Sequence, residues 1–234
     1  MPIRLNPELD REAIARALAR DRRAVVSDVL TPDGAERVLG WLERETPWSF
    51  TWFEDRAAIL PHDRLESVTP GEWQALQRRI FLRAREAFAY AYHVYTLGRP
   101  APLQRRGVPV EAFFDFLNGE EMLDFIRTVL DEPEVKAADA QATRFGPGQF
   151  LGLHNDLAPG HDRRVAYVFQ FTPRWRPDWG GELVFPTTES GRGEVFLPGF
   201  NRLHLFRVPQ DHHVNVVAPF AGGYRYAISG WFTA

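Results

Sequence analysis

The chain has 234 residues, 44% of them hydrophobic, which is enough to bury a full core in one domain. It contains no cysteine, so disulfides, thiolate nucleophiles and cysteine-ligated metals are excluded, and any metal site must use His, Asp or Glu. The formal net charge of −3 argues against a surface built for nucleic acid. With no signal-peptide pattern and no run of about 20 apolar residues, we expect a soluble, cytoplasmic protein with no nucleic-acid or membrane partner.

The front of the chain, residues 1–135, has mainly helical patterns. Apolar residues at helical spacing predict four helical segments: 8–21, 31–45, 69–95 and, broken at Asn118-Gly119, 110–131. Pro32 follows Thr31 as a first-turn proline follows an N-cap residue. Between the first two helices, a β-branched run at 23–30 can join a sheet. We expect these helices to support the remainder of the chain.

The back of the chain, residues 136–234, consists of short runs rich in Val, Phe, Tyr and Leu, separated by Gly, Pro and Asp. The runs are AQATRFG, QFLGLHN, RVAYVFQF, GELVFP, EVFLP, RLHLFRV, HHVNVVAP and YRYAISGWF. Eight short strands with turn signals between them predict a β-sandwich or a double-sheet jelly roll. The fold class is therefore α+β with a mainly β core, and residues 1–234 form a single domain with the helices against one outer face.

One strand, at about 149–155, ends in a histidine and a carboxylate. His154 and Asp156 are two residues apart, so both side chains point to one side of the strand and can reach one ion. The alternative is a histidine hydrogen-bonded to a nearby aspartate, without a metal. A third ligand is available in the pair His212 and His213, of which only one can face the ion because adjacent strand residues face opposite sides. Two histidines and one carboxylate form the facial triad of non-haem Fe(II) oxygenases.

With these motifs in order, residues 143 to 234 resemble the Fe(II)- and 2-oxoglutarate-dependent dioxygenases, and among them the prolyl-4-hydroxylase-type branch. That branch has H-x-D, a strand, W-x-x-x-W-G-G-x-L, H-x-V-x-x-V and R-x-A-x-S/T-x-W. The matching segments are RFGPGQFLGLHND, RRVAYVFQFTPRWRPDWGGELVF, FLPGFNRLHLF, HHVNVV and YRYAISGWF. In the front of the chain only VVSDVLTPDGAERVLGWL is similar to the family. The resemblance implies a double-stranded β-helix, another name for the jelly roll.

The resemblance also implies the ligand set and the co-substrate site. It makes His154 and Asp156 iron ligands, and the H-x-V-x-x-V pattern fits a third ligand at His212, with His213 as the alternative. Arg225 takes the position of the cation that binds the distal carboxylate of 2-oxoglutarate. Ser229 lies on the same face of that strand.

Two residues depart from the pattern of the branch. Gln170 stands where many relatives have a tyrosine that also binds the distal carboxylate, and its amide can donate a hydrogen bond in the tyrosine's place. Phe145 is a second position at which a tyrosine hydroxyl is missing. The histidines outside the pattern have no expected role, and His204 reads as an ordinary strand histidine.

Residues that could contact a substrate are Asn155 within the H-x-D motif, Arg163 or Arg164 after it, and Trp231 on the last strand. Solvation of a loop and packing in the core explain these residues equally well.

The implied activity is hydroxylation of a substrate C–H bond with Fe(II), 2-oxoglutarate and O2, in which 2-oxoglutarate becomes succinate and CO2. A prolyl or other residue in a protein is the expected substrate. The same chemistry on a free amino acid or another small molecule is the first alternative. A non-catalytic jelly-roll binding module is the second, and it predicts a broken triad or a missing arginine.

Overall fold

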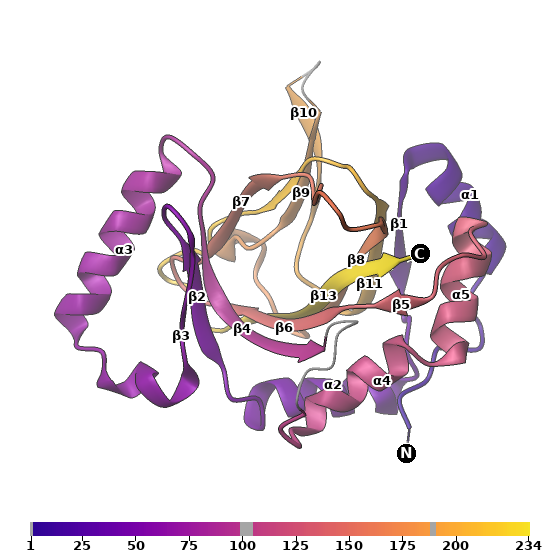
Figure 1. Ribbon diagram of the computed structural model, residues 1–234, viewed down its shortest axis with the longest axis horizontal. Coiled ribbons are helices and arrows are strands. Elements are labelled where there is room, and N and C mark those ends of the chain that lie inside the picture. The colour runs from indigo at the N-terminus through magenta and orange to yellow at the C-terminus, as the bar shows by residue number, and fades with distance from the viewer. Residues whose placement is uncertain (1, 99–104, 188–190) are drawn as a thin grey trace.

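The computed structural model describes residues 2–98, 105–187 and 191–234 (Figure 1). The α-helices are α1 (Arg11–Asp21), α2 (Pro32–Arg44), α3 (Pro70–Ala84), α4 (Ala112–Leu117) and α5 (Glu120–Leu130). Short 3-10 helices lie at His62–Ser67, Pro109–Glu111 and Pro177–Trp179. The strands of the front half are β1 (Arg23–Ser27), β2 (Ser49–Phe53), β3 (Ala57–Leu60) and β4 (Tyr90–Gly98). The strands of the back half are β5 (Ala137–Ala138), β6 (Ala140–Phe145), β7 (Phe150–His154), β8 (Arg163–Phe171), β9 (Leu183–Thr187), β10 (Arg192–Phe196), β11 (Phe200–Arg207), β12 (His212–Val214) and β13 (Arg225–Thr233).

These strands form one curled antiparallel sheet in the order β1-β11-β8-β13-β6-β4-β7-β12-β9-β10. The order is far from the chain order, because strands remote in sequence are paired: β1 pairs with β11, and β13 lies between β8 and β6. Figure 1 shows the sheet curling around an interior, with the β9–β10 hairpin projecting from it. The expected double-stranded β-helix with helical support is confirmed.

Alternation along the strands separates two cores. On β8, Tyr167 and Phe169 face the helices α1, α2, α4 and α5 in the larger core, whereas Ala166 and Val168 face the interior of the curled sheet. In Figure 1, α1 and α5 lie at one end and α2 and α4 below the sheet. The helix α3 lies at the other end, over β2 and β4, with a small core of its own. The interior of the curl is thus left to the smaller cluster and to polar side chains.

Local sequence explains where the helices begin. The Asp10 side chain accepts a hydrogen bond from the backbone N–H of Ala13 at the start of α1. Thr69 and Glu72 form a capping box at the start of α3. Thr31 occupies the N-cap position of α2 as expected, but its side chain makes no capping bond.

The predicted helix over 69–95 is wrong in its second half. The helix α3 ends at Ala84, and Tyr90–Gly98 forms strand β4. β4 lies between β6 and β7, with both of its faces against packed side chains. Such a strand reads as a continuous apolar run, which periodicity alone does not separate from a buried helix. The front half therefore supplies strands β1 to β4 to the sheet as well as helices.

Besides the pairing of β1 with β11, one buried side chain joins the front half to the core. Asn201, next to the start of β11, accepts a hydrogen bond from the backbone N–H of Leu30 at 2.9 Å and donates one to its carbonyl at 2.8 Å. Its backbone has φ of 52°, in the left-handed region that asparagine tolerates.

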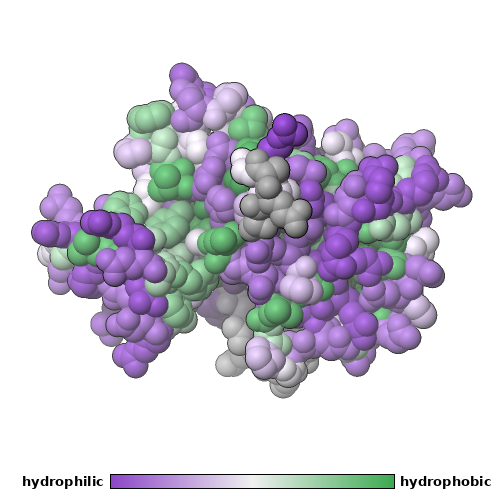
Figure 2. Space-filling model, turned by 90° about the horizontal axis from the view of Figure 1, so that it is seen from above, coloured by the Kyte–Doolittle hydropathy of each residue, from purple (hydrophilic) through white to green (hydrophobic). Residues whose placement is uncertain are grey.

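The surface is mainly hydrophilic where the helices face outward. Figure 2 shows this over the end formed by α1 and α5, whereas hydrophobic side chains are exposed between α3 and the centre of the molecule. None of the helices in the described parts of the chain is long and apolar enough to cross a membrane.

Candidate metal centre

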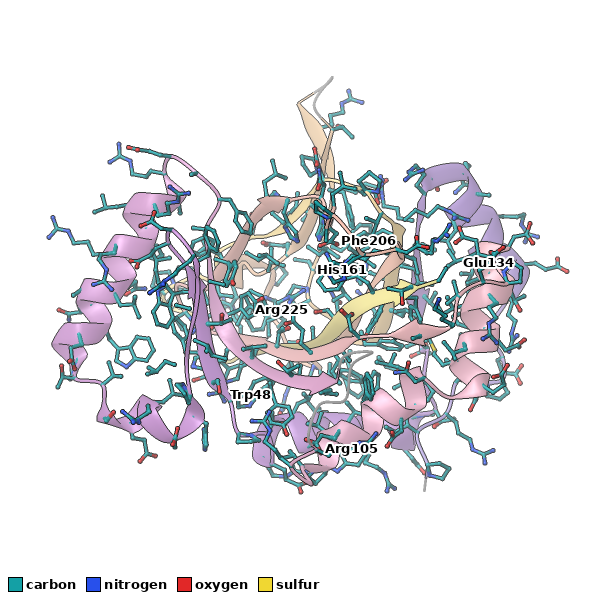
Figure 3. The ribbon with its side chains drawn as sticks, in the orientation of Figure 1. Trp48, Arg105, Glu134, His161, Phe206 and Arg225 are labelled. Atoms are coloured by element: carbon teal, nitrogen blue, oxygen red, sulfur yellow. The ribbon has the colours of Figure 1, made fainter. Side chains whose placement is uncertain are left out.

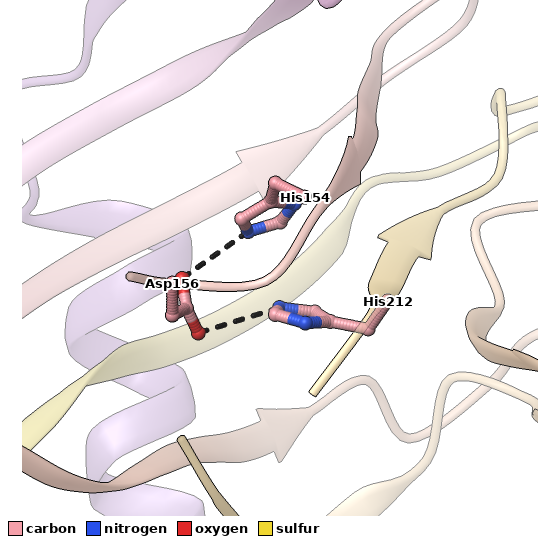
Figure 4. Close-up of side chains that lie close together, drawn as sticks. All are labelled: His154, Asp156 and His212. Atoms are coloured by element: carbon pink, nitrogen blue, oxygen red, sulfur yellow. Dashed lines mark ion pairs between the residues drawn. The ribbon is translucent and has the colours of Figure 1, made fainter. Parts of the chain in front are cut away.

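His154, Asp156 and His212 come together at the mouth of the curled sheet (Figure 4). One ligand atom of each lies within 4.8 Å of the others. His154 Nε2 is 3.3 Å from Asp156 Oδ1, and His212 Nε2 is 3.6 Å from Asp156 Oδ2. The pairing of β12 with β7 sets His212 directly opposite His154, and the ring centroids are 4.1 Å apart. Two segments almost sixty residues apart thus form a single three-donor site.

Both imidazoles have their second nitrogen fixed by the backbone. Nδ1 of His154 lies 2.9 Å from the carbonyl oxygen of Gly152, and Nδ1 of His212 lies 2.9 Å from that of Gln210. A carbonyl can only accept, so in each ring Nδ1 carries the proton and Nε2 has a free lone pair. Both Nε2 atoms face Asp156. This is the tautomer that a metal ligand requires, set before any ion arrives.

The charges of the site agree with that tautomer. Burial lowers the pKa of His212 to about 4, and the neighbouring His154 adds to this effect. Burial alone would raise the pKa of Asp156, but the close approach of the His154 and His212 rings lowers it overall. At neutral pH the site therefore contains a neutral His212 imidazole and a carboxylate, which suit a divalent ion.

The backbone around the two ligands at the end of β7 is tightly fitted. Gly152 donates a hydrogen bond to the carbonyl oxygen of Ala89 at 2.9 Å, and a Cβ on this glycine would lie 2.7 Å from that oxygen. Asp156 has φ of 66°, in the left-handed region, which turns its carboxylate back toward the histidine that precedes it. The residue directly before β4 therefore helps to position His154.

His213 takes no part in this cluster. Its Nε2 lies 3.0 Å from Oδ1 of Asn215, which in turn donates to Glu182. The strand alternation that allowed only one ligand of the pair thus places His212 inside and His213 on the opposite face.

A cavity of about 580 Å³ runs from the three donors into the curl. Its wall comes mainly from the inner faces of β4, β6, β8 and β13. The lining residues other than the three donors and those of the mouth include Tyr90, Tyr92, Gln141, Thr143, Phe145, Ala166, Val168, Phe206, Val214, Arg225, Ala227 and Ser229. Figure 3 shows Arg225 and Phe206 within the curled sheet.

Arg225 reaches this cavity as a buried charge. Only 2% of the residue is exposed, and its Nε and Nη2 have no hydrogen-bond partner among the described residues. Burial lowers its pKa to about 10, although Glu182 opposes the shift. The carbon of its guanidinium lies 5.1 Å from the centre of the Phe145 ring. A buried, unpaired guanidinium is costly, and a carboxylate guest would provide the missing acceptors.

The other two residues expected at the co-substrate site have different positions. Ser229 lines the cavity on the same face of β13 as Arg225. Gln170 is not among the lining residues; it is buried beside Ala227, and neither atom of its amide has a hydrogen-bond partner among the described residues.

Asn155, Arg163 and Trp231 are at the mouth of the cavity. The Arg163 guanidinium lies over the Trp231 ring, 3.5 Å from its centre, and donates a hydrogen bond to the backbone carbonyl of Asp156. Arg164 points elsewhere, to Asp162. Of the two arginines considered for substrate contact, only Arg163 is therefore close to the metal centre.

Sequence reasoning missed the contribution of β4. Tyr90 and Tyr92 line the cavity, and the Tyr92 ring stacks on Phe145 with centroids 4.9 Å apart. The tyrosines alternate with smaller residues in AYAYHVY, which is a strand signal, although the run also fits the continuation of the preceding helix.

The arrangement defines a class of protein: a jelly roll that presents two histidines, one carboxylate and a buried arginine to one cavity, as in non-haem iron oxygenases. Residues 140–233, which carry the entire site, match the family model described as the 2OG-Fe(II) oxygenase superfamily. The core is thus that of a 2OG-Fe(II) oxygenase, an enzyme that uses Fe(II), 2-oxoglutarate and O2. No protein with curated annotation matches the sequence significantly.

Solved structures with the same fold extend over nearly the full chain. A prolyl-4-hydroxylase from Pseudomonas putida is 18% identical, with a TM-score of 0.61 over 95% of this chain and 98% of its own. An oxidoreductase of the 2OG-Fe(II) oxygenase family from Burkholderia pseudomallei is 14% identical, with a TM-score of 0.64 over 98% and 93%. A prolyl hydroxylase from Trichoplax adhaerens, solved with a peptide fragment of the hypoxia inducible factor oxygen degradation domain, is 17% identical, with a TM-score of 0.64 over 95% and 88%. These similarities establish a fold of the prolyl-4-hydroxylase type.

Proposed function

We propose that the protein hydroxylates a residue within a protein or peptide, with a prolyl residue as the first candidate. The observation that carries the proposal is the mouth of the cavity. Leu153 and Leu157 line it and are 56% and 64% exposed, and Phe88 lies beside them. Exposed apolar side chains around a functional cavity mark a surface that a larger partner covers. The peptide bound to the Trichoplax enzyme supports the same class of substrate.

In the proposed site, His154, Asp156 and His212 would hold Fe(II). Arg225 receives the distal carboxylate of 2-oxoglutarate, with Ser229 and Gln170 beside it. When bound, these groups supply the oxidation of a C–H bond to an alcohol, and 2-oxoglutarate leaves as succinate and CO2.

The chain itself orients the metal ligands and excludes water from the cavity. The backbone carbonyls of Gly152 and Gln210 keep the free lone pairs of both histidines pointing inward. The aromatic residues Tyr90, Tyr92 and Phe145 form a wall that keeps water from the end of the cavity. No side chain has to act as a general acid or base.

A free amino acid is the second candidate, because Arg163 places a charge at the mouth that could bind a small carboxylate. The Arg163 guanidinium, however, already lies over the Trp231 ring and donates a hydrogen bond to the Asp156 carbonyl, which makes it less available to a substrate. The non-catalytic binding module is not favoured, since it predicted a broken triad or a missing arginine. The cytoplasmic location expected from the sequence stays a prediction.

The metal and co-substrate part of the proposal is tested by adding Fe(II) and 2-oxoglutarate without oxygen and recording the visible charge-transfer band. We expect a band in the wild type and in His213→Ala, which removes a neighbouring histidine outside the cluster. His154→Ala should abolish the band, and Arg225→Ala should weaken it. A folded wild-type protein without the band would contradict the proposed site.

The substrate class is tested at the mouth. Proline-containing peptides should stimulate succinate formation more than free proline does. The double variant Leu153→Ser, Leu157→Ser should raise KM for the peptide several-fold without changing succinate formation in its absence. Equal stimulation by free proline, or an unchanged KM, would favour the small-molecule alternative.

A further inference from the structure

Three buried polar side chains on the neighbouring strands β8, β11 and β13 together have six nitrogen or oxygen atoms without a partner among the described residues. The atoms are Nε and Nη2 of Arg225, both amide atoms of Gln170 and both ring nitrogens of His204. The three residues are 2%, 1% and 2% exposed. A buried polar atom without a partner is destabilising, so such a concentration indicates a place for a polar guest.

The sheet register brings the three side chains together. β8 lies between β11 and β13, and Gln170 pairs with Arg202 on one side and with Ala227 on the other. His204 and Arg225 are each two residues from those partners, so both are diagonal neighbours of Gln170 on the inner face. Diagonal neighbours in a sheet are within reach of long side chains.

The inner orientation of His204 follows from its own strand. Phe206, two residues further along β11, belongs to the core inside the curl and lines the cavity. His204 therefore points the same way, and it packs on Phe196 with ring centroids 5.0 Å apart. It is not the ordinary strand histidine expected from the sequence.

His204 is a neutral hydrogen-bonding group. Burial lowers its pKa to about 3, and the positive charges of Arg225 and Arg202 add to this effect. At neutral pH the imidazole can donate from one nitrogen, and it does not add a second positive charge beside Arg225. A carboxylate at this point would meet one cation and neutral donors.

We propose that His204 and Gln170 complete the distal-carboxylate subsite, so that Arg225, Gln170 and His204 together bind the far end of 2-oxoglutarate. The inference rests on the proposed function and deepens it by naming a contact residue, His204, to which the sequence pattern assigned no role. Gln170 offers its amide N–H and His204 its ring N–H to the carboxylate. Both are positioning and specificity residues for the co-substrate.

The test measures affinity without turnover, by calorimetric titration of the Mn(II)-loaded protein. Two probes are compared: 2-oxoglutarate, and 2-oxopentanoate, which has the same chain length but ends in a methyl group. His204→Leu and Gln170→Leu should each weaken 2-oxoglutarate about tenfold or more, as expected for loss of a hydrogen bond to a charged group. Their affinity for 2-oxopentanoate should stay within about twofold of the wild type. The more conservative His204→Gln, which keeps an N–H donor, should recover part of the affinity.

The control is His93→Leu, which removes a partly buried imidazole that hydrogen-bonds to Gln149 outside the cavity. It should bind both probes as the wild type does. Without ligand, His204→Leu should melt at or above the wild-type temperature, since it removes unpaired polar atoms, whereas a purely structural role predicts a lower one.

The outcomes separate the two proposals. A wild type that binds 2-oxoglutarate, with His204→Leu binding it equally well, would overturn this inference alone. If His204→Leu or Gln170→Leu weakened the binding of both probes equally, the inference would also be overturned. A wild type that does not distinguish 2-oxoglutarate from 2-oxopentanoate would overturn both this inference and the proposed co-substrate site.

Discussion

Replacing Arg225 by Met is expected to stabilise the ligand-free protein and to remove its response to 2-oxoglutarate. Burial lowers the pKa of Arg225 from its usual value to about 10, so keeping its charge inside the fold costs about 3 kcal/mol. Methionine is similar in length and loses only the contact with the Phe145 ring, worth about 1 kcal/mol. The free energy of unfolding should therefore rise by about 2 kcal/mol, or about 4–8 °C in Tm for a chain of this size.

The assay is thermal unfolding of the Mn(II)-loaded protein with increasing 2-oxoglutarate. The wild-type Tm should rise with ligand concentration, because the ligand binds the folded state, and that of Arg225→Met should not. Arg192→Met, at an exposed position on β10, is the matched control and should behave as the wild type in both respects. A lower Tm for Arg225→Met together with an undiminished ligand response would refute the reasoning.

Three further predictions address the metal, the pH and the core. Asp156→Gly and Asp156→Ala should both lose Mn(II) binding in a calorimetric titration, and wild-type affinity in either would argue against the carboxylate as a ligand. The alanine variant should be less stable than the glycine variant by about 1 kcal/mol, because glycine adopts φ of 66° without strain. The pKa of His204 is about 3 in the folded protein, and its reference value is 6.5. As the pH falls, the unfolded chain therefore binds a proton at this histidine before the folded protein does. This difference should lower the free energy of unfolding by about 2 kcal/mol between pH 6.5 and 5. Urea unfolding of His204→Leu should show a correspondingly shallower loss, and equal slopes would contradict the buried, neutral state. Asn201→Ala should destabilise by about 3 kcal/mol, since it leaves the buried N–H and C=O of Leu30 unpaired; an unchanged urea midpoint would count against this.

The strands of the back half could be predicted because each one is short, alternating and bounded by Gly, Pro or Asp. β4 could not, since both of its faces are covered and its apolar residues fit a helical period as well as a strand. The deciding interaction is pairing with β6 and β7, whose sequences lie about fifty residues further along. Local pattern contains no information about such partners.

In the site too, some features could be predicted from local sequence and others depend on strand pairing. The alternation along β13 places Arg225 and Ser229 on the correct face without knowledge of the fold. The two-residue spacing of His154 and Asp156 also predicts that they lie together, but Asp156 lies beyond the end of β7, and its left-handed backbone directs the carboxylate. Their roles as ligands and co-substrate contacts stay predictions. The environment of His204 could not be predicted from the sequence, because a lone histidine belongs to no recognisable motif and its neighbours Gln170 and Arg225 come from two other strands.

The position of β13 has a consequence for synthesis of the protein. It is the last strand in chain order, yet it lies in the middle of the sheet, between β8 and β6, and it carries Arg225. While a ribosome is still producing the chain, β8 and β6 each have an open edge of unpaired backbone groups that can pair wrongly. The sheet can close only when residues 225–233 emerge, and the same residues bring the arginine into the cavity. A chain that terminates early therefore loses its fold and its co-substrate site together.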